Sequence, residues 1–307
     1  MEQGQRRGLI RRNELGWLWG GFTLPGAAWL LAFFFIPFYA VAGVAFGSTD
    51  PIFLTPQPQW NPLKWDFTAF DDTLSRVLTG DLRAPFERTL LYVFCAVVLC
   101  FVIGYPVAYY LARHAGRART LLLALLILPF WVSYLMRMLA WVNLLSPDGW
   151  VNRFLEAFPI FGGPRNFLDA NPVTVVLGLV YGYVPFLILP LYATLDRIDP
   201  RLLEAARDAG ASARSAFFRV TLPLSKQGCL AAAVIVALPM FGDYYTTDLL
   251  SRSPKTSMIG NQITFYIQNS TQKQIGASLV LILSAMLLVL MAYYVWVTAR
   301  AQRELER

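Results

Sequence analysis

The chain has 307 residues, of which 56% are hydrophobic and only 15% charged, and its formal net charge is +7. Such an apolar excess is atypical of soluble enzymes and requires either one very large core or a lipid bilayer. Continuous apolar runs of about 20 residues favour the bilayer, because strands of soluble proteins are shorter and alternate in polarity. The composition therefore disfavours an ordinary soluble domain.

Six apolar runs predict six transmembrane helices, and thus an all-α integral membrane protein. The runs are apolar on every face and about twice as long as a barrel strand, which disfavours a transmembrane β-barrel. Asp243 and Asp248 interrupt the outer half of the fifth run. The predicted spans are Trp17 to Phe46, Phe86 to Leu111, Thr120 to Leu145, Pro172 to Leu195, Gln227 to Leu250 and Ile275 to Ala299.

Basic residues gather on one side of these spans. Sixteen Lys and Arg residues lie in the two termini and in the loops after the second and fourth spans, against nine in the other loops. Because positive charge stays cytoplasmic, both termini are predicted to be cytoplasmic. The first run is too long for the core of a secretory signal, so we expect it to be retained. The positive charge thus indicates topology and contact with anionic lipids, and it does not indicate nucleic-acid binding.

The sequence contains no pattern typical of a catalytic or metal site. His114 is the single histidine and lies in a basic loop, whereas Cys95, Cys100 and Cys229 lie in or at the ends of apolar runs, where cysteine acts as a small hydrophobe. No HExxH, CxxC or GxxxxGK[ST] spacing occurs. We therefore expect a chain that is not an enzyme, binds no metal or cofactor, and carries no ATPase of its own.

The loop between the fourth and fifth predicted spans, residues 196–226, is the most strongly patterned segment. Its apolar residues recur at helical spacing and predict a short amphipathic helix over residues 200–209. Pro200 suits the first turn of this helix, and Gly210 suits a left-handed cap at its end. The loop is therefore expected to present an ordered helix on the cytoplasmic face.

A second short helix is expected from Ser212 to Arg219, after which Leu222-Pro223 turns the chain back toward the membrane. In its spacing the loop resembles the EAA motif of ABC-importer permeases. The matching positions are Glu204, Ala205, Ala206, Gly210, Val220, Thr221, Leu222 and Pro223. The resemblance implies that this loop is a coupling helix, which docks on a separate ATPase subunit that uses ATP and Mg.

From about Leu24 onward the chain is similar to the PotB type of spermidine/putrescine permease. The stretches that carry this resemblance are Leu128-Pro-Phe-Trp131 with Arg137, Gly178 to Tyr181, Pro185-Phe186, Leu189 to Tyr192, Leu202 to Ser212, Thr247 to Leu250 and Ile259 to Asn261. The resemblance implies the type I (MetI-like) importer fold, with a tail, first span and outer loop in residues 1–85 and a permease core in residues 86–307. It also implies an ATPase homodimer, a second permease subunit and an external solute-binding protein as partners.

A desolvated polycation would need carboxylates to balance its charge and aromatic faces to replace water. The candidates for such a path are Asp243, Asp248, Tyr244, Trp131, Tyr134 and Arg137. Asp248 can equally be a helix-end residue at the membrane interface. Arg137 lies three residues after Tyr134 and should share its face, where it is expected to reach the outer interface or to pair with one of the aspartates.

Other substrates remain open, because Arg252 and Lys255 at the outer mouth would repel a polycation modestly. An opine-like compound, an organophosphonate or ferric iron would fit the same mechanism. An ion-coupled secondary transporter or a structural membrane scaffold would leave the patterned loop unexplained, and no inverted repeat is visible. The expected mechanism is alternating access, in which closure of the ATPase moves the loop at residues 200–223 and rocks the spans.

Overall fold

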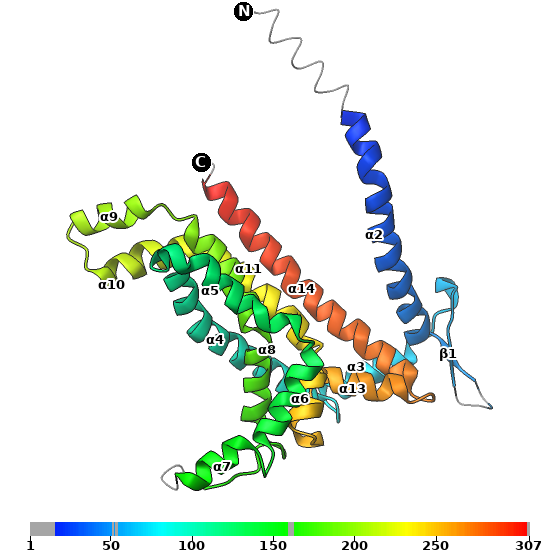
Figure 1. The fold of residues 1–307 in the computed structure, drawn as a ribbon. Helices are drawn as coiled ribbons and strands as arrows, with labels where there is room; N and C mark the ends of the chain where they lie inside the picture. Colours follow the sequence, from blue (N-terminus) through cyan, green and yellow to red (C-terminus); the bar gives the residue numbers. More distant parts are fainter. Residues whose placement is uncertain (1–15, 51, 53–54, 159–162, 306–307) are drawn as a thin grey trace, which may run out of the picture. The chain divides into compact units, whose positions relative to one another are not determined.

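The structure, a computed structural model, describes residues 16–50, 52, 55–158 and 163–305. The regular secondary structure of this part of the chain is helical apart from one short antiparallel hairpin of β1 (Ser48–Thr49) and β2 (Pro56–Gln57) (Figure 1). Five of its helices are long and apolar enough to cross a membrane, and a bent pair of helices supplies a sixth span if it is counted as one. The basic N-terminal tail lies outside the described residues, and the cytoplasmic placement of the termini stays a prediction.

Four predicted spans are confirmed with shifts of a few residues at their ends. They are α2 (Gly16–Ala45), α4 (Arg83–Arg113), α8 (Pro172–Asp196) and α14 (Lys273–Leu305). Each exceeds the roughly 20 residues that a helix needs to cross the hydrocarbon layer.

The third span is broken, so the prediction of one continuous helix there was wrong. α5 (Arg119–Ile127) passes into the short 3-10 helix η3 (Leu128–Trp131), and α6 (Tyr134–Leu145) then leaves at an angle of 87° to the preceding segment. The backbone is extended at Val132, and the Ser133 side chain accepts a hydrogen bond from the Met136 amide at 3.3 Å. A new helix therefore starts with its own N-cap.

The fifth span differs from its prediction at both ends. α10 (Ala213–Ala216), the π-helical turn η5 (Phe217–Thr221) and α11 (Leu222–Phe241) form one continuous helix, so Leu222-Pro223 does not turn the chain. Proline has no N–H to donate, and a π-turn reorganises the hydrogen bonds around it. The helix ends at Gly242, and the segment expected to complete the span forms a separate helix, α12 (Tyr245–Leu250).

The remaining elements are short. They are η1 (Pro62–Lys64), α3 (Thr68–Leu78), η2 (Gly116–Ala118), α7 (Trp150–Ala157), α9 (Pro200–Asp208), η6 (Pro254–Thr256) and α13 (Ile259–Gln268). The described chain divides into two compact units. Among the described residues, the smaller unit comprises those up to Thr73 together with Tyr266–Leu281, and the larger unit comprises those between Leu74 and Phe265 together with those from Ile282 onward. The predicted boundary between residues 85 and 86 stays a prediction.

The smaller unit has its own core, in which Phe46 and Trp65 pack around Ala45. The Gln274 side chain ties the hairpin to this core, because its amide donates to the Gly47 carbonyl at 2.8 Å and its oxygen accepts from the Thr49 hydroxyl at 3.2 Å. A buried side-chain amide thus meets the polar groups at the end of α2, as buried polar groups require.

In the larger unit α4 packs along α8, and α11 packs against both. Figure 1 shows α9 and α10 at one end of this unit and α7 at the other. α8 and α11 approach so closely at Gly228 that a Cβ atom there would lie 2.2 to 2.5 Å from the Oγ1, Cγ2 and Cβ atoms of Thr194. This contact leaves no room for a side chain on α11.

We predict that Gly228→Ala destabilises the protein, because the new methyl group overlaps Thr194 and overpacking costs about 1–3 kcal/mol. Thermal unfolding in detergent, followed by tryptophan fluorescence, should give a lower midpoint than that of the wild type. Gly26→Ala is the matched control, since it also lies in a helix and its added Cβ would meet nothing within 4 Å. Equal midpoints for the two variants would contradict the close contact.

Candidate functional site

The Asp243 carboxylate is the most heavily hydrogen-bonded acid among the sequence candidates. Its Oδ2 accepts from the hydroxyls of Tyr134 at 2.9 Å, Tyr183 at 3.0 Å and Thr246 at 2.9 Å, and its Oδ1 accepts from the Thr246 amide at 2.9 Å. The Asp243 side chain is only 7% exposed. These four residues, called the Asp243 cluster below, compensate a buried charge with donors from three helices, α6, α8 and α12.

The Asp243 cluster lies directly after α11. Gly242 ends that helix, and its N–H bonds back to the Pro239 carbonyl at 3.2 Å. Asp243 therefore occupies the short link between α11 and α12, while Tyr134 opens α6 after the break in the third span. The two interruptions of the predicted spans meet at one carboxylate.

Arg137 lies on the same helix as Tyr134, as predicted, but it pairs with neither aspartate. Its guanidinium carbon lies 4.6 Å from the ring centroid of Phe130, 5.5 Å from that of Tyr134 and 5.8 Å from that of Tyr181. Aromatic faces attract a cation through their quadrupole. The expected ion pair is thus replaced, among the described residues, by three aromatic contacts.

Asp248 lies in a different environment, on the wall of a cavity of about 500 Å³. The Asn261 side-chain amide donates to its Oδ1 at 2.6 Å and to the Tyr244 carbonyl at 3.0 Å. The Asn261 oxygen in turn accepts from the Met258 amide at 2.8 Å. Asn261 therefore fixes Asp248 at the cavity, whose lining consists of Thr247, Asp248, Arg252, Ser253, Pro254, Ser257, Asn261, Gln262 and Phe265.

This cavity retains unused polar groups. Asp248 is exposed, and its Oδ2 makes no hydrogen bond with a described residue. The Thr247 hydroxyl is buried and likewise has no partner within the described part of the chain. A carboxylate oxygen and a hydroxyl are both able to accept hydrogen bonds from an ammonium group. Arg252 also lines this cavity. It is one of the two basic residues that the sequence analysis expects to repel a polycation at the outer mouth.

The remaining aromatic candidates lie apart from these groups. The Tyr244 ring stacks on that of Tyr245 at a centroid distance of 4.1 Å. Trp131 projects from η3 and is 85% exposed. Neither Tyr244 nor Trp131 donates a hydrogen bond to a carboxylate of the described residues. The structure therefore groups Tyr134 with Asp243 and leaves Trp131 at the surface of the larger unit.

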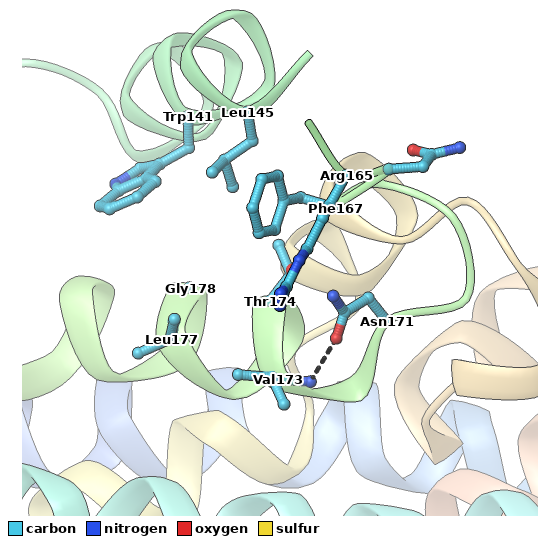
Figure 2. A pocket seen from close by; sticks show the side chains of 10 residues that line it. Trp141, Leu145, Arg165, Phe167, Asn171, Val173, Thr174, Leu177 and Gly178 are labelled. Carbon is cyan, nitrogen blue, oxygen red and sulfur yellow. Dashed lines mark hydrogen bonds between the residues drawn. The ribbon is translucent and has the colours of Figure 1, made fainter. Parts of the chain in front are cut away.

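A second cavity, of about 360 Å³, lies between α6, the loop before α8 and the start of α8 (Figure 2). Figure 2 shows Trp141 and Leu145 of α6 facing Leu177 across this space, with Phe167 beside them. Its walls are mainly apolar, and Arg165 is the charged residue in its lining. It therefore offers no carboxylate to a cationic solute.

The loop that follows α8 forms the helix that its pattern predicts. The Asp199 side chain caps α9 by accepting from the Arg201 amide at 2.9 Å. At the other end Gly210 has a φ of +87°, its N–H bonds to the Arg207 carbonyl at 2.8 Å, and the Ala211 N–H bonds to the Ala206 carbonyl at 3.0 Å. Those bonds form a Schellman motif, which confirms the predicted left-handed cap.

α9 exposes its predicted contact residues. The helix contains no buried residue, Glu204 and Ala205 are exposed, and Leu202 is half exposed. α9 packs against α10 and η5. An isolated nine-residue helix is marginal in water, so the two caps and these contacts hold it in place. The further motif residues Leu222 and Pro223 lie at the start of α11.

Sequence reasoning missed several residues of this arrangement. Tyr183 and Thr246 complete the Asp243 cluster, and Asn261 positions Asp248. A tyrosine or threonine in an apolar run is ordinarily a packing or interfacial residue, so nothing local marked them. Within the described residues no three His, Cys, Asp or Glu side chains are placed to hold a metal ion.

The comparisons with known proteins agree with this architecture. Residues 101–303 match the family described as "Binding-protein-dependent transport system inner membrane component". The chain is 34% identical over 265 residues to the spermidine/putrescine transport system permease protein PotB of Escherichia coli, covering 85% of this chain and 92% of that protein. It is 35% identical over 283 residues to PotB of Haemophilus influenzae, covering 91% of this chain and 92% of that protein.

A solved structure supports the fold independently. The crystal structure of a bacterial alginate ABC transporter, in complex with an alginate-bound periplasmic protein, contains a chain that superimposes with a TM-score of 0.71 at 19% sequence identity. The match covers 93% of this chain and 95% of that chain. The apolar spans, the capped helix α9 and the sequence matches lead to one conclusion: the chain belongs to the family of inner-membrane permease components of binding-protein-dependent ABC transporters, and it is a multi-pass bacterial inner-membrane protein.

Proposed function

We propose that this chain is a transmembrane permease subunit of an ATP-driven importer for polyamines such as spermidine and putrescine. The observation that carries the proposal is the 34–35% identity to spermidine/putrescine permeases over 85–91% of the chain. Permeases of this family have no ATPase of their own, so an ATPase dimer drives the cycle. A second permease subunit and an external solute-binding protein complete the proposed assembly.

The Asp248 cavity is the proposed site of contact with the cationic substrate. Its carboxylate is oriented by Asn261 and keeps one oxygen without a partner among the described residues. Opposite charge and free acceptors suit the ammonium group of a polyamine. Asp243 is proposed to have a structural role instead, because it is buried and its carboxylate already accepts four hydrogen bonds, three of them at Oδ2.

Coupling to ATP hydrolysis is proposed to pass through α9. Its exposed residues, Glu204 and Leu202 among them, form the surface proposed to be offered to the ATPase. From α10 onward a single helix of 29 residues, Ala213–Phe241, leads to the Asp243 cluster. At about 1.5 Å per residue this helix is about 43 Å long, so it can carry a displacement of the loop across the membrane.

Alternating access follows from this connection. Closure of the ATPase dimer displaces α9, and the helix behind it moves its far end at Gly242. The Asp243 cluster joins that end to α6, α8 and α12, so these helices shift together. The cavity beside Asp248 is thereby proposed to open alternately to the outside and to the inside.

We predict that the complete transporter imports radiolabelled spermidine or putrescine and that Asp248→Asn lowers this uptake at least tenfold. The substitution removes the charge but keeps the shape and the contact with Asn261. A tenfold loss corresponds to about 1.4 kcal/mol of lost interaction. Asp81→Asn, in an outer loop where Arg76 binds the carboxylate at 2.7 Å, is the control and should transport normally. A wild-type complex that hydrolyses ATP but imports neither polyamine would refute the proposed substrate.

We predict that Glu204→Lys uncouples transport, because it reverses the charge on the exposed face of α9. Uptake should fall at least tenfold, while the chain still inserts in the membrane and unfolds at the wild-type temperature. Glu87→Lys reverses the charge of an exposed glutamate elsewhere and serves as a control. Normal uptake in Glu204→Lys would remove this residue from the coupling contact.

We predict that Gly210→Pro also uncouples transport, since proline cannot adopt a φ of +87° and removes the N–H that bonds to Arg207. Gly210→Asn is the matched variant, because asparagine tolerates the left-handed region and keeps the N–H. ATP-dependent uptake should be lost in the first and largely retained in the second. Equal losses of uptake in both variants would mean that any side chain at position 210 disturbs coupling, and that the left-handed cap is not the cause.

We predict that Asp243→Asn lowers the thermal unfolding midpoint as well as uptake. In the wild type the Tyr134 and Tyr183 hydroxyls donate to the carboxylate. The amide of the variant keeps one acceptor oxygen but places N–H donors opposite these donating hydroxyls. The Asp248→Asn protein should keep its midpoint, so the pair of variants separates a structural role from a path role. An unfolding midpoint unchanged in Asp243→Asn would contradict the structural role of the cluster.

A further inference from the structure

The segment between α8 and α9 is held by the two arginines that flank the α4–α5 loop. Arg113, the last residue of α4, donates from Nη2 to the Ile198 carbonyl at 2.8 Å. Arg119, the first residue of α5, donates from Nη2 to Oδ2 of Asp196, the last residue of α8, at 2.6 Å. Ile198 directly precedes Asp199, the N-cap of α9. Both contacts therefore hold the chain immediately before α9 begins.

These two contacts reinforce each other. An exposed ion pair on its own contributes little to stability, and the side chains of Arg119 and Asp196 are 38% and 36% exposed. The guanidinium carbon of Arg119 also lies 4.7 Å from the ring centroid of Tyr192, one turn earlier on α8. The Arg113 hydrogen bond is partly buried. Because a charged donor bonds more strongly where water is excluded, the bond to the Ile198 carbonyl is the firmer of the two anchors.

The α4–α5 loop is itself ordered, so it is able to support the neighbouring segment. The His114 N–H caps α4 by bonding to the Tyr110 carbonyl at 2.8 Å, and the His114 ring stacks on that of Tyr110 at a centroid distance of 5.9 Å. Gly116 has a φ of +47°, and the 3-10 turn η2 leads directly into α5. Arg113 and Arg119 therefore belong to one compact turn that joins α4 to α5.

The helix that follows these anchors is exposed. α9 contains no buried residue, whereas Leu195 and Ile198 just before it are both buried. α9 packs against α10 and η5, which continue into α11. The chain therefore changes from an anchored segment to an exposed helix within residues 197–199. A rotation of α9 relative to α8 has to be taken up by the backbone dihedral angles of these residues, as in hinges at the ends of helices.

We propose that Arg113 and Arg119 are positioning residues that anchor a hinge at residues 197–199, about which α9 turns during the transport cycle. With its first end held, α9 passes its displacement to α10, and so to the helix of Ala213–Phe241, and not to the adjoining end of α8. The inference rests on the proposed function, in which an ATPase displaces α9. It adds the fixed point that such a displacement requires, and it assigns that role to the α4–α5 loop.

Charge exchange across the ion pair tests the anchor in the assembled transporter. Arg119→Asp places a second carboxylate beside Asp196, and it should lower the amount of radiolabelled spermidine imported per ATP hydrolysed at least fivefold. The double variant Arg119→Asp with Asp196→Arg restores opposite charges and should recover at least half of the wild-type ratio. Arg117→Asp is the matched control, because Arg117 lies in the same loop, is exposed and forms no hydrogen bond or ion pair with a described residue. A wild-type ratio in Arg119→Asp, or a double variant no better than the single one, would overturn the proposal.

The other anchor is tested by removing its donor. Arg113→Met keeps a long side chain but cannot bond to the Ile198 carbonyl, so the ratio of imported spermidine to hydrolysed ATP should again fall at least fivefold. Arg113→Lys keeps a charged donor without the planar guanidinium and should give an intermediate ratio. Equal ratios in the wild type and Arg113→Met would remove Arg113 from the hinge.

Thermal unfolding separates an anchor for movement from a contact that only stabilises the fold. The midpoint of Arg119→Asp should lie close to that of the wild type, because an exposed ion pair contributes little to stability. A midpoint lowered as strongly as in Gly228→Ala would overturn the proposal in favour of a structural role.

Distances between spin labels show whether the hinge lies at residues 197–199. Leu121 on α5, Ala193 on α8 and Asp208 at the end of α9 are all exposed and suit labelling. In the wild-type complex the 121–193 distance should be the same without nucleotide and with trapped ATP, while the 121–208 distance changes. In Arg119→Asp the 121–193 distance should change with nucleotide as well.

The same distances distinguish a failed hinge from a failed function. A wild-type 121–193 distance that changes as much as the 121–208 distance would overturn the hinge and leave the proposed function intact. A 121–208 distance that stays constant in a complex that imports spermidine would refute coupling through α9, and the inference with it. A complex that hydrolyses ATP but imports no spermidine would refute the proposed substrate alone, because the label distances test the hinge without any substrate.

Discussion

A carboxylate buried among membrane helices must be given hydrogen-bond donors, and the architecture around Asp243 follows from this constraint. Its partners Tyr134, Tyr183 and Thr246 come from α6, α8 and α12. Two of these helices begin immediately after breaks in apolar runs that would otherwise pass straight through the bilayer. Irregular backbone at membrane depth is tolerated only when it is buried in protein or lines a cavity. The Asp243 cluster supplies the buried environment for this irregular backbone. The breaks in the third and fifth spans bring Tyr134 within hydrogen-bond distance of Asp243.

The same cluster lies at the far end of the helix that leads from the loop containing α9. α10, η5 and α11 form one helix from Ala213 to Phe241, and the π-turn at η5 accommodates Pro223 without a kink of the chain away from the membrane. π-turns inside helices frequently mark functional segments. The proposed coupling uses this helix: a displacement of α9 would be passed along it to the link that holds Asp243, and from there to α6, α8 and α12. This continuity is the structural basis of the proposed coupling.

The sequence was sufficient for the helical membrane fold, for most span positions and for the capped helix α9. Length and apolar character predict spans well, and Pro200 and Gly210 have local mechanisms as start and stop signals. The break in the third span was not predictable, because it depends on the tertiary partners of Tyr134. In the fifth run Asp243 and Asp248 marked the irregular half, but nothing local showed that the helix ends at Phe241 and that a separate helix follows. The expected ion pair of Arg137 failed for a related reason: helical spacing places two residues on one face but does not identify what lies opposite.

The distance between spin labels at Arg214 on α10 and Tyr245 on α12 tests the rigid connection most directly. Both residues are exposed, and they bracket the helix of Ala213–Phe241. Double electron–electron resonance should give the same label separation in the nucleotide-free and ATP-trapped complex, while the distance from Arg214 to a label at Val98 on α4 changes. A 214–245 distance that changes with nucleotide as much as the 214–98 distance would contradict transmission along this helix.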